Sequence, residues 1–493
     1  MLSYEELAPA ERELWDAFPE GRSVDLRADT PDDDPAEGDR WGPERTIRAV
    51  VLAALLLGAS PGQPFTVAAL RLAGARITGR LDLSGSEIDH MLWLEGCWFD
   101  EIPSFCGATT RTIVIHRCEL PGIDATMAQI NGRLDLRHSV LHGRLALLNS
   151  RIAGELVLTD STVLEPSGWA LWAGGLMMES GVFCHRLIAH GGIRLPGAHL
   201  PGGLFMQGAQ VQNPGASAFV ADNATASTMV FSEGFTAQGT VRLRGAQIRD
   251  ELTFDGAVLS SDGVALDCSR MQAGDFSFTP AAPPVGAVDL QGAQVTVLHD
   301  AKDAWPDVVR LQGFVYESIQ PSDGIQGTKA THRVAWIRRE PGYAPQPYEQ
   351  LATWYRRVGH DDGARRVLLA KQRHYRSTLR PAGRLWGHLL DATVGYGYRP
   401  WLAGLWLLAL SLLGTTVFST AHSPKPVQPD QGPPFNAFVY TLDLLIPIGG
   451  LGQRNAWYWT GDAAQWLAYA LIAAGWILTT AVVAGVSRSL NKT

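Results

Sequence analysis

The stretch GRLDLRHSVLHGRLALLNSRIAGELVLTDS, from Gly132 to Ser161, repeats one short pattern three times. Leu136, Leu147 and Leu158 lie eleven residues apart, and a serine follows each of them three positions later. Apolar residues that alternate with polar ones are typical of short β-strands. A repeat this regular indicates a stack of similar units, so it takes precedence over arguments from single residues.

The same spacing extends in both directions along the chain. Earlier it is seen at Leu72, Leu83 and Leu94 and at Ala75, Ser86 and Cys97, and later at Ala198, Ala209, Ala246, Ala257 and Ala293. The pattern predicts a mainly β fold, a parallel β-solenoid (β-helix) over residues 61–320 with a stacked Leu/Ile interior and two eleven-residue units per coil. Glycines would form the corners, and small residues would let coils approach closely. Cys97 and Cys118 occupy this small position, which favours packing over catalysis.

Length and composition divide the rest of the chain into regions. The 493 residues are 46% hydrophobic and only 18% charged, which excludes a single soluble enzyme domain. Residues 1–40 form an acidic segment with thirteen Asp or Glu against four Arg. Residues 41–60 predict a helix that caps the first coil, and residues 321–398 predict a helical neck with helices at Pro347–Arg357 and Gly363–Arg380. No nucleic-acid reading motif is present, so we expect no nucleic-acid partner.

Two segments near the C-terminus are long and apolar enough to cross a bilayer. Trp401–Thr420 holds twenty residues without a charge and Ala463–Ser487 holds twenty-five, and a span needs about 20 apolar residues. We therefore predict transmembrane helices at 399–421 and 463–488. Arginines including Arg399 precede the first span, and Arg488 and Lys492 follow the second. This distribution predicts a multi-pass protein of the bacterial cell membrane with both termini in the cytoplasm.

The external loop at 422–462 contains a segment, Phe435 to Gly452, that has two interpretations. It is too short to span, but it could enter the bilayer as a half-helix and line a water-filled path in a small oligomer. The residues of this candidate pore segment are Asp443, Pro447, Gly449, Gly450 and Gly452. The alternative is an amphipathic helix at the outer surface with Asp443 in water. We favour the second interpretation because the loop contains no T-V-G-Y-G filter.

No motif of a known catalytic chemistry is found. The chain lacks G-x-G-x-x-G, a P-loop, H-E-x-x-H and G-x-S-x-G, so we predict no catalytic, cofactor-binding or metal-ligating residues. The five cysteines are far apart and include no C-x-x-C pair, so we expect free thiols. The histidine pairs His138/His142 and His185/His190 are expected to be solvated residues of the solenoid.

Several aspartates of the repeat region remain as candidates. Asp82 and Asp135 occupy equivalent outward positions, and Asp267 and Asp289 follow later. Carboxylates gathered on one outer face could form the acid/base pair of a polysaccharide-cleaving enzyme. The alternative, which we favour, is that an outward aspartate beside an arginine such as Arg133 keeps the coil soluble.

Four motifs along the chain combine these regions. They are RTIRAVVLAALLL from Arg45, GRLDL at Gly79 and at Gly132, YEQLATWYRRVGHDDGARRVLLAKQRHYR from Tyr348, and VGYGYRPW from Val394. Together they resemble a family of bacterial, mainly actinobacterial, membrane-anchored proteins that join degenerate pentapeptide-like or β-helical repeats to paired C-terminal transmembrane helices. Members are often labelled membrane-associated oxidoreductases, so the resemblance implies that activity.

Three functional hypotheses follow. The first is a membrane-anchored, non-catalytic scaffold or sensor whose solenoid binds a protein partner, because long regular faces suit such contacts. The second is a small oligomeric channel or membrane effector that the solenoid regulates. The third is the oxidoreductase implied by the resemblance. The expected partners are the lipid bilayer, a protein on the solenoid face and further copies of the chain, and no cofactor is expected.

Overall fold

The computed structural model describes residues 3–28, 33–60, 65–322, 324, 327–381, 383–384, 387–388, 391, 395, 401–421, 424–428, 433–447, 449–459 and 463–490, with the backbone alone for 167 and 481–490. The chain forms two compact units, Met1–Gln350 and Leu351–Thr493. We describe each unit by itself.

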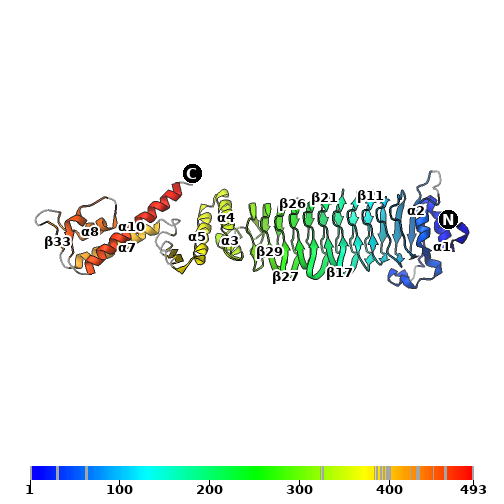
Figure 1. Cartoon of the computed structure of the whole chain (residues 1–493), viewed down its shortest axis with the longest axis horizontal. Helices are drawn as coiled ribbons and strands as arrows, with labels where there is room; N and C mark the ends of the chain where they lie inside the picture. The colour runs from blue at the N-terminus through cyan, green and yellow to red at the C-terminus, as the bar shows by residue number, and fades with distance from the viewer. Residues whose placement is uncertain are drawn as a thin grey trace. The chain divides into compact units, whose positions relative to one another are not determined.

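A parallel β-solenoid of about 11 turns makes up most of the first unit (Figure 1), which confirms the predicted fold. Leu134 of one coil pairs with Leu156 of the next, 22 residues later, so a coil holds two eleven-residue units as predicted. Some coils are longer, since Leu156 pairs with Val182, 26 residues later. The extra residues lengthen a strand at one side of the coil, for example β17 (Thr162–Trp172).

The coils stack into two parallel sheets in the described part of the chain. The first sheet contains β1 (Ser23–Asp25), β3 (Ala69–Ala73), β5 (Met91–Glu95), β7 (Thr109–Thr110), β8 (Ile113–His116), β11 (Gln129–Ile130), β12 (Leu134–Asp135), β15 (Arg151–Ile152), β16 (Leu156–Val157), β18 (Met177–Met178), β19 (Val182–Phe183), β21 (His199–Leu200), β22 (Leu204–Phe205), β24 (Thr225–Val230), β26 (Gln247–Thr253), β28 (Gln272–Phe278), β30 (Gln294–Asp300) and β32 (Val315–Pro321). The second contains β2 (Thr46–Arg48), β4 (Arg76–Thr78), β6 (Trp98–Phe99), β9 (Glu119–Leu120), β10 (Ile123–Asp124), β13 (Val140–Leu141), β14 (Leu145–Ala146), β17, β20 (Ile188–Arg194), β23 (Gln210–Val220), β25 (Thr236–Arg242), β27 (Val258–Asp267), β29 (Val285–Asp289) and β31 (Val309–Arg310).

The repeat is set by a corner at which one residue adopts a left-handed backbone conformation. Positive φ angles recur every eleven residues, at Gly74, Gly85, Gly96 and Gly107 and again at Met127, His138, Asn149 and Asp160. The next residue is the small one of the sequence pattern, and it is buried in the coil: Cys97 is 0% and Cys118 1% exposed. The corner therefore explains the glycines, and coil packing explains Cys97 and Cys118, as predicted.

The interior of the later coils is aromatic as well as aliphatic. Phe231 and Phe254 stack with ring centroids 4.9 Å apart, and the series continues through Phe276 and Phe278 to Trp305. All five rings are buried. The predicted Leu/Ile interior thus describes the earlier coils, whereas large planar side chains fill the later ones.

Helices cover the N-terminal end of the solenoid, where α1 (Pro9–Ala17) and α2 (Ala49–Leu56) lie (Figure 1). Short 3₁₀ helices accompany them at Tyr4–Glu6, Phe18–Glu20, Pro35–Arg40 and Pro43–Arg45. Strand β1 pairs with β3, and β2 pairs with β4. The first coil therefore begins inside the segment that the sequence suggested was only an acidic N-terminal extension.

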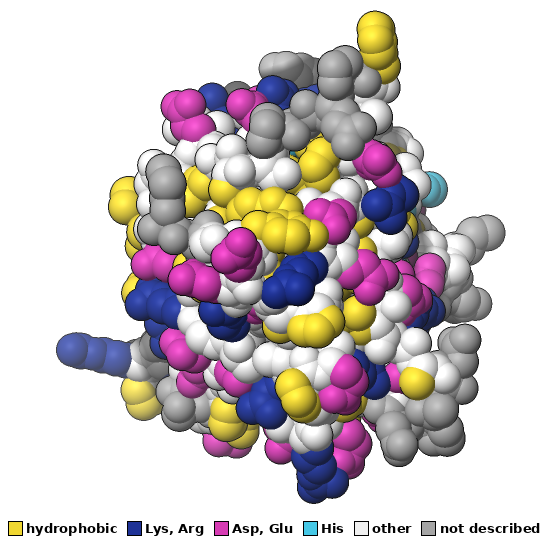
Figure 2. All heavy atoms as spheres, turned by 90° about the vertical axis from the view of Figure 1, so that its right-hand side faces the viewer, with side chains coloured by type: hydrophobic (Ala, Val, Ile, Leu, Met, Phe, Trp, Pro, Cys, Tyr) yellow, Lys and Arg dark blue, Asp and Glu magenta, His cyan; other side chains and the backbone are white. Residues whose placement is uncertain are grey.

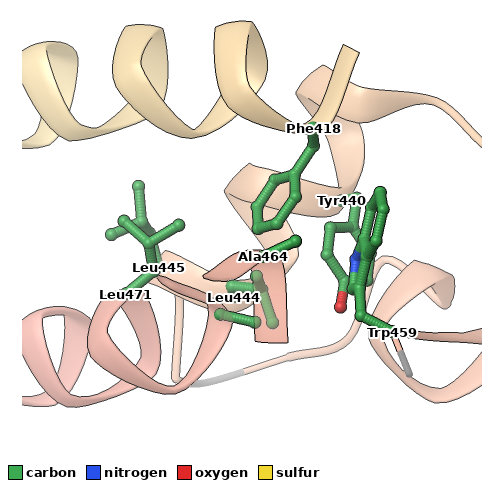
Figure 3. Packing of buried hydrophobic residues seen from close by; sticks show 8 residues of the cluster. Phe418, Tyr440, Leu444, Leu445, Trp459, Ala464 and Leu471 are labelled. Carbon is green, nitrogen blue, oxygen red and sulfur yellow. The ribbon is translucent and has the colours of Figure 1, made fainter. Parts of the chain in front are cut away.

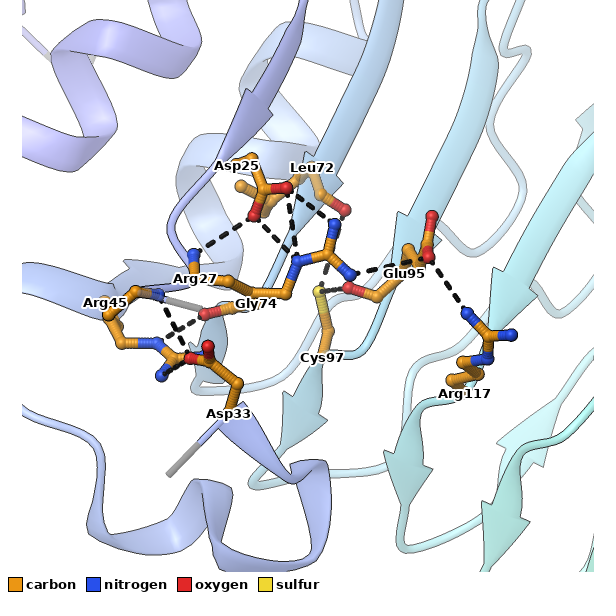
Figure 4. Close-up of polar contacts among 10 residues, drawn as sticks. Asp25, Arg27, Asp33, Arg45, Leu72, Gly74, Glu95, Cys97 and Arg117 are labelled. Carbon is orange, nitrogen blue, oxygen red and sulfur yellow. Dashed lines mark hydrogen bonds and ion pairs between the residues drawn. The ribbon is translucent and has the colours of Figure 1, made fainter. Parts of the chain in front are cut away.

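Ion pairs and hydrogen bonds of charged side chains connect the segments at the N-terminal end of the solenoid (Figure 4). Arg27 donates to the Asp25 carboxylate at 2.6 Å and also lies 3.5 Å from Glu95 in a neighbouring coil. Arg45, which is buried, donates to the Gly74 carbonyl at 2.8 Å and to Asp33 at 2.7 Å. Acidic and basic side chains are interspersed over the end as a whole (Figure 2), which disfavours end-to-end stacking of solenoids.

Two helices close the other end, α3 (Ala330–Ile337) and the first turns of α4 (Pro345–Arg357). Gln346 and Gln350 donate to the carbonyls of Phe314 and Tyr316 in the last coil, which satisfies acceptors that another coil would otherwise satisfy. Asp300 at the end of β30 accepts hydrogen bonds from Arg333 of α3 at 2.7 and 2.8 Å, and both residues are buried.

The second unit is helical in its described part. It contains α5 (Asp361–Thr378), α7 (Trp401–Thr420), α8 (Ala437–Leu445), α9 (Gln453–Ala456), α10 (Ala463–Leu490) and the paired short strands β33 (Lys425–Pro426) and β34 (Trp457–Tyr458). Helices α7 and α10 are long and apolar enough to span a membrane. They match the two predicted spans, although Arg399 and Lys492 lie outside the described residues.

The corner conformation gives a direct test of the coil. Met127 is 56% exposed and has a φ of 56°, so Met127→Ile forces a β-branched residue into a left-handed corner. We expect its free energy of unfolding to be about 1–2 kcal/mol below that of Met127→Gly. Denaturant unfolding of the full-length protein in detergent, followed by circular dichroism, measures the difference.

The matched control is Gln129→Ile, at an exposed strand position of the same coil. There isoleucine suits the extended backbone, and we expect little change. Equal losses of stability at both positions would show that the corner geometry does not limit the coil.

Candidate functional site

The aspartates of the repeat were the first catalytic candidates, and the structure pairs three of the four with arginine. Asp82 is exposed and accepts from Ser84, whereas the Asp135, Asp267 and Asp289 side chains are at most 8% exposed. The prediction that Asp135 is solvated on the outside of the coil is therefore wrong. Long side chains of neighbouring coils cover the outward carboxylate, which a pattern of alternating residues does not reveal.

Asp135 lies in a cluster of bases. Its carboxylate is 2.9 Å from His116 Nε2, 2.7 Å from Arg137 and 3.7 Å from Arg133. Burial raises the pKa of Asp135, but the nearby His116 and the hydrogen bonds from Arg137 outweigh it and hold the pKa well below its ordinary value. A carboxylate held ionised in this way stabilises the coil and is a poor general acid.

Asp267 and Asp289 are direct neighbours on adjacent coils. Arg244 pairs with Asp267 at 2.6 Å, and Arg310 pairs with Asp289 at 3.0 Å. Retaining and inverting glycosidases keep one carboxyl protonated beside a second that is reactive. Two carboxylates that are each held by an arginine do not resemble that arrangement, so we assign them to coil-to-coil cohesion.

The histidine pairs do not form a site. His142 Nε2 is 2.5 Å from Glu119, His138 is 3.9 Å from Asp160, and His185 stacks on Phe183. In the described part of the chain, no group of three His, Cys, Asp or Glu side chains is arranged to hold a metal ion. Burial raises the pKa of the Cys184 thiol to about 12, so this thiol is not an activated nucleophile.

A shallow groove lies on the first sheet of the solenoid. It has a volume of about 440 Å³ and crosses β21, β24, β26, β28 and β30. Its walls carry His199, Thr225, Gln247, Gln272 and Thr296, roughly one polar side chain per coil. His199, Thr225, Gln247 and Gln272 share one register across adjacent strands, and His199 Nδ1 lies 2.7 Å from Thr225 Oγ1.

The lining also contains apolar residues, among them Ile248. Ala226, Ala273 and Gly274 lie between the taller polar side chains. A side chain at Gly274 would overlap the carbonyl oxygen of Asp250 in the neighbouring coil, so only glycine allows β28 to approach β26 there. Bulges in β24 and β26 at the same place interrupt the regular register.

Sequence reasoning did not identify this groove. The available signal was a glutamine before an apolar residue at Gln247, Gln272 and Gln294, 22 to 25 residues apart. Because the coil lengths vary, the shared register of these residues becomes visible only in the folded chain. The groove is polar and almost uncharged, with Arg249 as its one arginine among the described lining residues.

The candidate pore segment forms a hairpin that packs against both apolar helices. Helix α8 packs against both α7 and α10, and Phe418, Tyr440, Leu445, Trp459 and Leu471 lie in one buried cluster (Figure 3). The helix has nine residues and is shorter than the expected half-helix, because it ends at Leu445. Pro447 follows, and Gly449 and Gly452 adopt positive φ angles in the return turn.

Asp443 forms hydrogen bonds with the backbone of the return turn. Its carboxylate accepts from the backbone N–H of Leu451 at 2.8 Å and of Arg454 at 2.7 Å, and its exposed fraction is 1%. The expectation of Asp443 in water is therefore wrong, since the return turn covers the side chain. Gly450 and its neighbours Gly449 and Gly452 are exposed in the single chain.

Two glycines allow the close approach of α8. A side chain at Gly414 of α7 would overlap Thr441, and one at Gly475 of α10 would overlap the carbonyl oxygen of Leu445. Small residues at helix contacts are typical of packing within membranes. The hairpin is thus built into the two-helix unit and does not lie loosely beside it.

Comparison with known proteins adds no assignment. No family model, no curated protein and no solved structure matches the chain.

The basic side chains around Asp135 predict that its contribution to the stability of the fold depends on pH. Replacing Asp135 by asparagine is expected to lower the free energy of unfolding by about 2 kcal/mol at pH 6, because charge-assisted hydrogen bonds are lost. A lowered carboxyl pKa stabilises the fold above the unfolded-state pKa of about 3.9 and loses this effect as pH falls. The difference from the native protein should therefore shrink below about pH 4.

Denaturant unfolding from pH 3 to 7 checks this expectation. Asp89→Asn is the control, because the Asp89 side chain is 81% exposed and pairs only with Arg111 at the surface. An effect of Asp135→Asn that stays constant with pH would contradict the assigned role.

The glycine contacts predict a local effect on the hairpin. Gly475→Ala should displace α8 and speed amide exchange in residues 437–445 by about tenfold, since overpacking costs over 1 kcal/mol. Gly404→Ala in α7 is the control, because a side chain there meets no atom within 4 Å. Hydrogen exchange of the full-length protein in detergent, read by mass spectrometry, compares the two. Unchanged exchange in Gly475→Ala would refute the contact.

Proposed function

We propose that the protein is a membrane-anchored, non-catalytic scaffold whose solenoid binds an extended polypeptide segment in the groove across β21–β30. The observation that carries the proposal is the column of polar side chains, one per coil, that lines this groove. The resemblance to membrane-anchored repeat proteins supports the same architecture. The arginine-paired aspartates favour binding over catalysis on the solenoid.

Exposed apolar side chains of α7 and α10 in the second unit support the proposed membrane anchor. Leu405, Leu408 and Leu412 of α7 and Trp466 and Trp476 of α10 are more than half exposed in the single chain. Large continuous apolar surfaces of this kind are unstable in water and mark contact with a bilayer or a partner. Helices of this length and composition suit the hydrocarbon core, which is about 30 Å thick.

The charges beside the spans support one orientation. Arg373 and Arg376 precede α7, and Arg488 lies near the end of α10. Positive residues favour the cytoplasmic side, so in our proposal both termini and the solenoid are cytoplasmic and the hairpin unit opens to the other side. The membrane is the bacterial cell membrane.

The dimensions of the groove suit a short extended segment. Adjacent coils are separated by about 4.8 Å, so the four steps from β21 to β30 cover about 19 Å. About six extended residues have the same length. The amides of Gln247 and Gln272 each offer donors and an acceptor, which can bond the peptide groups of such a segment.

Site-specific photo-crosslinking tests the binding role in living cells. A photo-reactive phenylalanine in place of Gln272 in the full-length protein should give one discrete protein adduct. The same residue in place of Gln238, which is exposed on β25 of the second sheet, should not. Adding Gln247→Ala should weaken the Gln272 adduct several-fold, because the adjacent amide is lost.

Mass spectrometry of the adduct identifies the partner and the crosslinked residue. The proposal fails when both positions give the same adducts, or when Gln272 gives none while the protein is present in the membrane. It also fails when the crosslinked residue lies in a helix of the partner, because the groove is argued to accept an extended segment.

A further inference from the structure

We infer that several copies of this chain meet around the hairpin of residues 437–459 and enclose a water-filled path for small anions in the membrane. The inference rests on the proposed membrane anchor, but it does not depend on what the solenoid binds. It follows from the depth of the hairpin, the exposure of its turn and the charge of one residue.

The outer ends of the two spans lie at one level. Phe418, near the end of α7, stacks on Trp459 just before α10, with ring centroids 5.3 Å apart. Both residues also belong to the cluster that contains Ala464 at the start of α10 (Figure 3). Distances along α7 and α10 from these ends therefore measure depth in the same frame.

Helix α8 runs inward from that level. Thr441 contacts Gly414, six residues before the end of α7, and Leu445 contacts Gly475, twelve residues after the start of α10. At 1.5 Å per residue these contacts are about 9 Å and about 18 Å deep. Gly475 is also the middle residue of the uncharged run 463–487. The C-terminal end of α8 therefore reaches the middle of the hydrocarbon core, about 15 Å from either surface.

The return turn starts near this depth and rises toward the outer end of α8, where Gln453 donates to the Pro434 carbonyl and accepts from the Asn436 N–H. Asp443 lies two residues before Leu445, and its carboxylate binds the N–H groups of Leu451 and Arg454. Non-helical backbone thus lies well inside the hydrocarbon region. Such backbone is tolerated only where protein buries it or water reaches it, because each unsatisfied peptide group costs several kcal/mol in lipid.

The single chain does not cover this turn. Gly449, Gly450, Leu451 and Gly452 are exposed, as are Arg454 and Asn455. Two spans and one half-helix cannot surround a path alone, so further copies of the chain must supply the remaining wall. The expectation of an amphipathic helix at the surface does not explain the contact between Leu445 and the middle of α10.

The charge of the turn sets the ion preference. Within the described turn, Arg454 is the exposed charged residue, and it forms no ion pair with the acidic side chains that the structure describes. Asp443 is buried and is already bonded to two N–H groups. A guanidinium inside the hydrocarbon region is costly unless water or an anion meets it, and a ring of arginines favours anions.

Flux through vesicles that contain the purified full-length protein tests the inference. We expect chloride efflux that exceeds potassium efflux, and we expect Arg454→Gln to reduce the chloride efflux about tenfold. Arg454→Lys should restore it, because the charge is kept. Lys425→Gln is the control, since Lys425 is exposed in the same loop outside the hairpin.

A thiol in the turn tests the geometry. Asn455→Cys, combined with Cys106→Ser, should react with a membrane-impermeant thiol reagent, block the chloride efflux and allow crosslinking between copies by a short bifunctional maleimide. Leu412→Cys on the apolar face of α7, in the same background, should remain unlabelled because lipid covers it.

Flotation of the same vesicles distinguishes a failure of the membrane anchor from a failure of the anion path. If the protein floats with the lipid but shows no chloride efflux, prefers cations, or gives no crosslink at Asn455→Cys, the path is refuted and the anchor stands. If the protein does not float with the lipid, the anchor itself fails.

Discussion

Backbone hydrogen bonding between successive coils is the constraint on which the rest of the first unit depends. Each corner residue donates its N–H to the coil that follows, as Met127 does to Leu148 and His138 to Thr159. This ladder requires the corners to superpose, which fixes the eleven-residue repeat, the left-handed φ angles and the small buried residue beside them. The side chains then stack in columns, and every surface feature of the solenoid is a consequence of that stacking.

Columns of like side chains explain both the stability and the candidate binding site. Where a column is charged, as at Asp267 and Asp289, arginines from neighbouring coils cover it and pair with it. Where a column is polar and neutral, as at Gln247 and Gln272, the side chains line the groove and need no counter-charge. The same stacking thus yields the ion pairs between coils and the polar lining of the groove.

The helical hairpin follows a different constraint, which is close contact between backbones. Gly414 and Gly475 bring α8 against both apolar helices, and Asp443 ties the return turn to α8. The sequence pointed to this segment and to Asp443, Pro447, Gly449, Gly450 and Gly452. It did not reveal that Asp443 is buried, because the residues that cover it follow eight to eleven positions later and require a turn of unpredictable shape.

The sequence by itself determined the β-solenoid, the number of repeat units per coil, the place of the cysteines and the two apolar helices. These features depend on local periodicity and on the length of apolar runs, both of which are properties of the linear chain. Only the tertiary structure decided which outward side chains are covered, where the groove lies and where the hairpin packs against α7 and α10. Those properties depend on the register between coils of unequal length and on contacts between helices distant in sequence, which no single segment encodes.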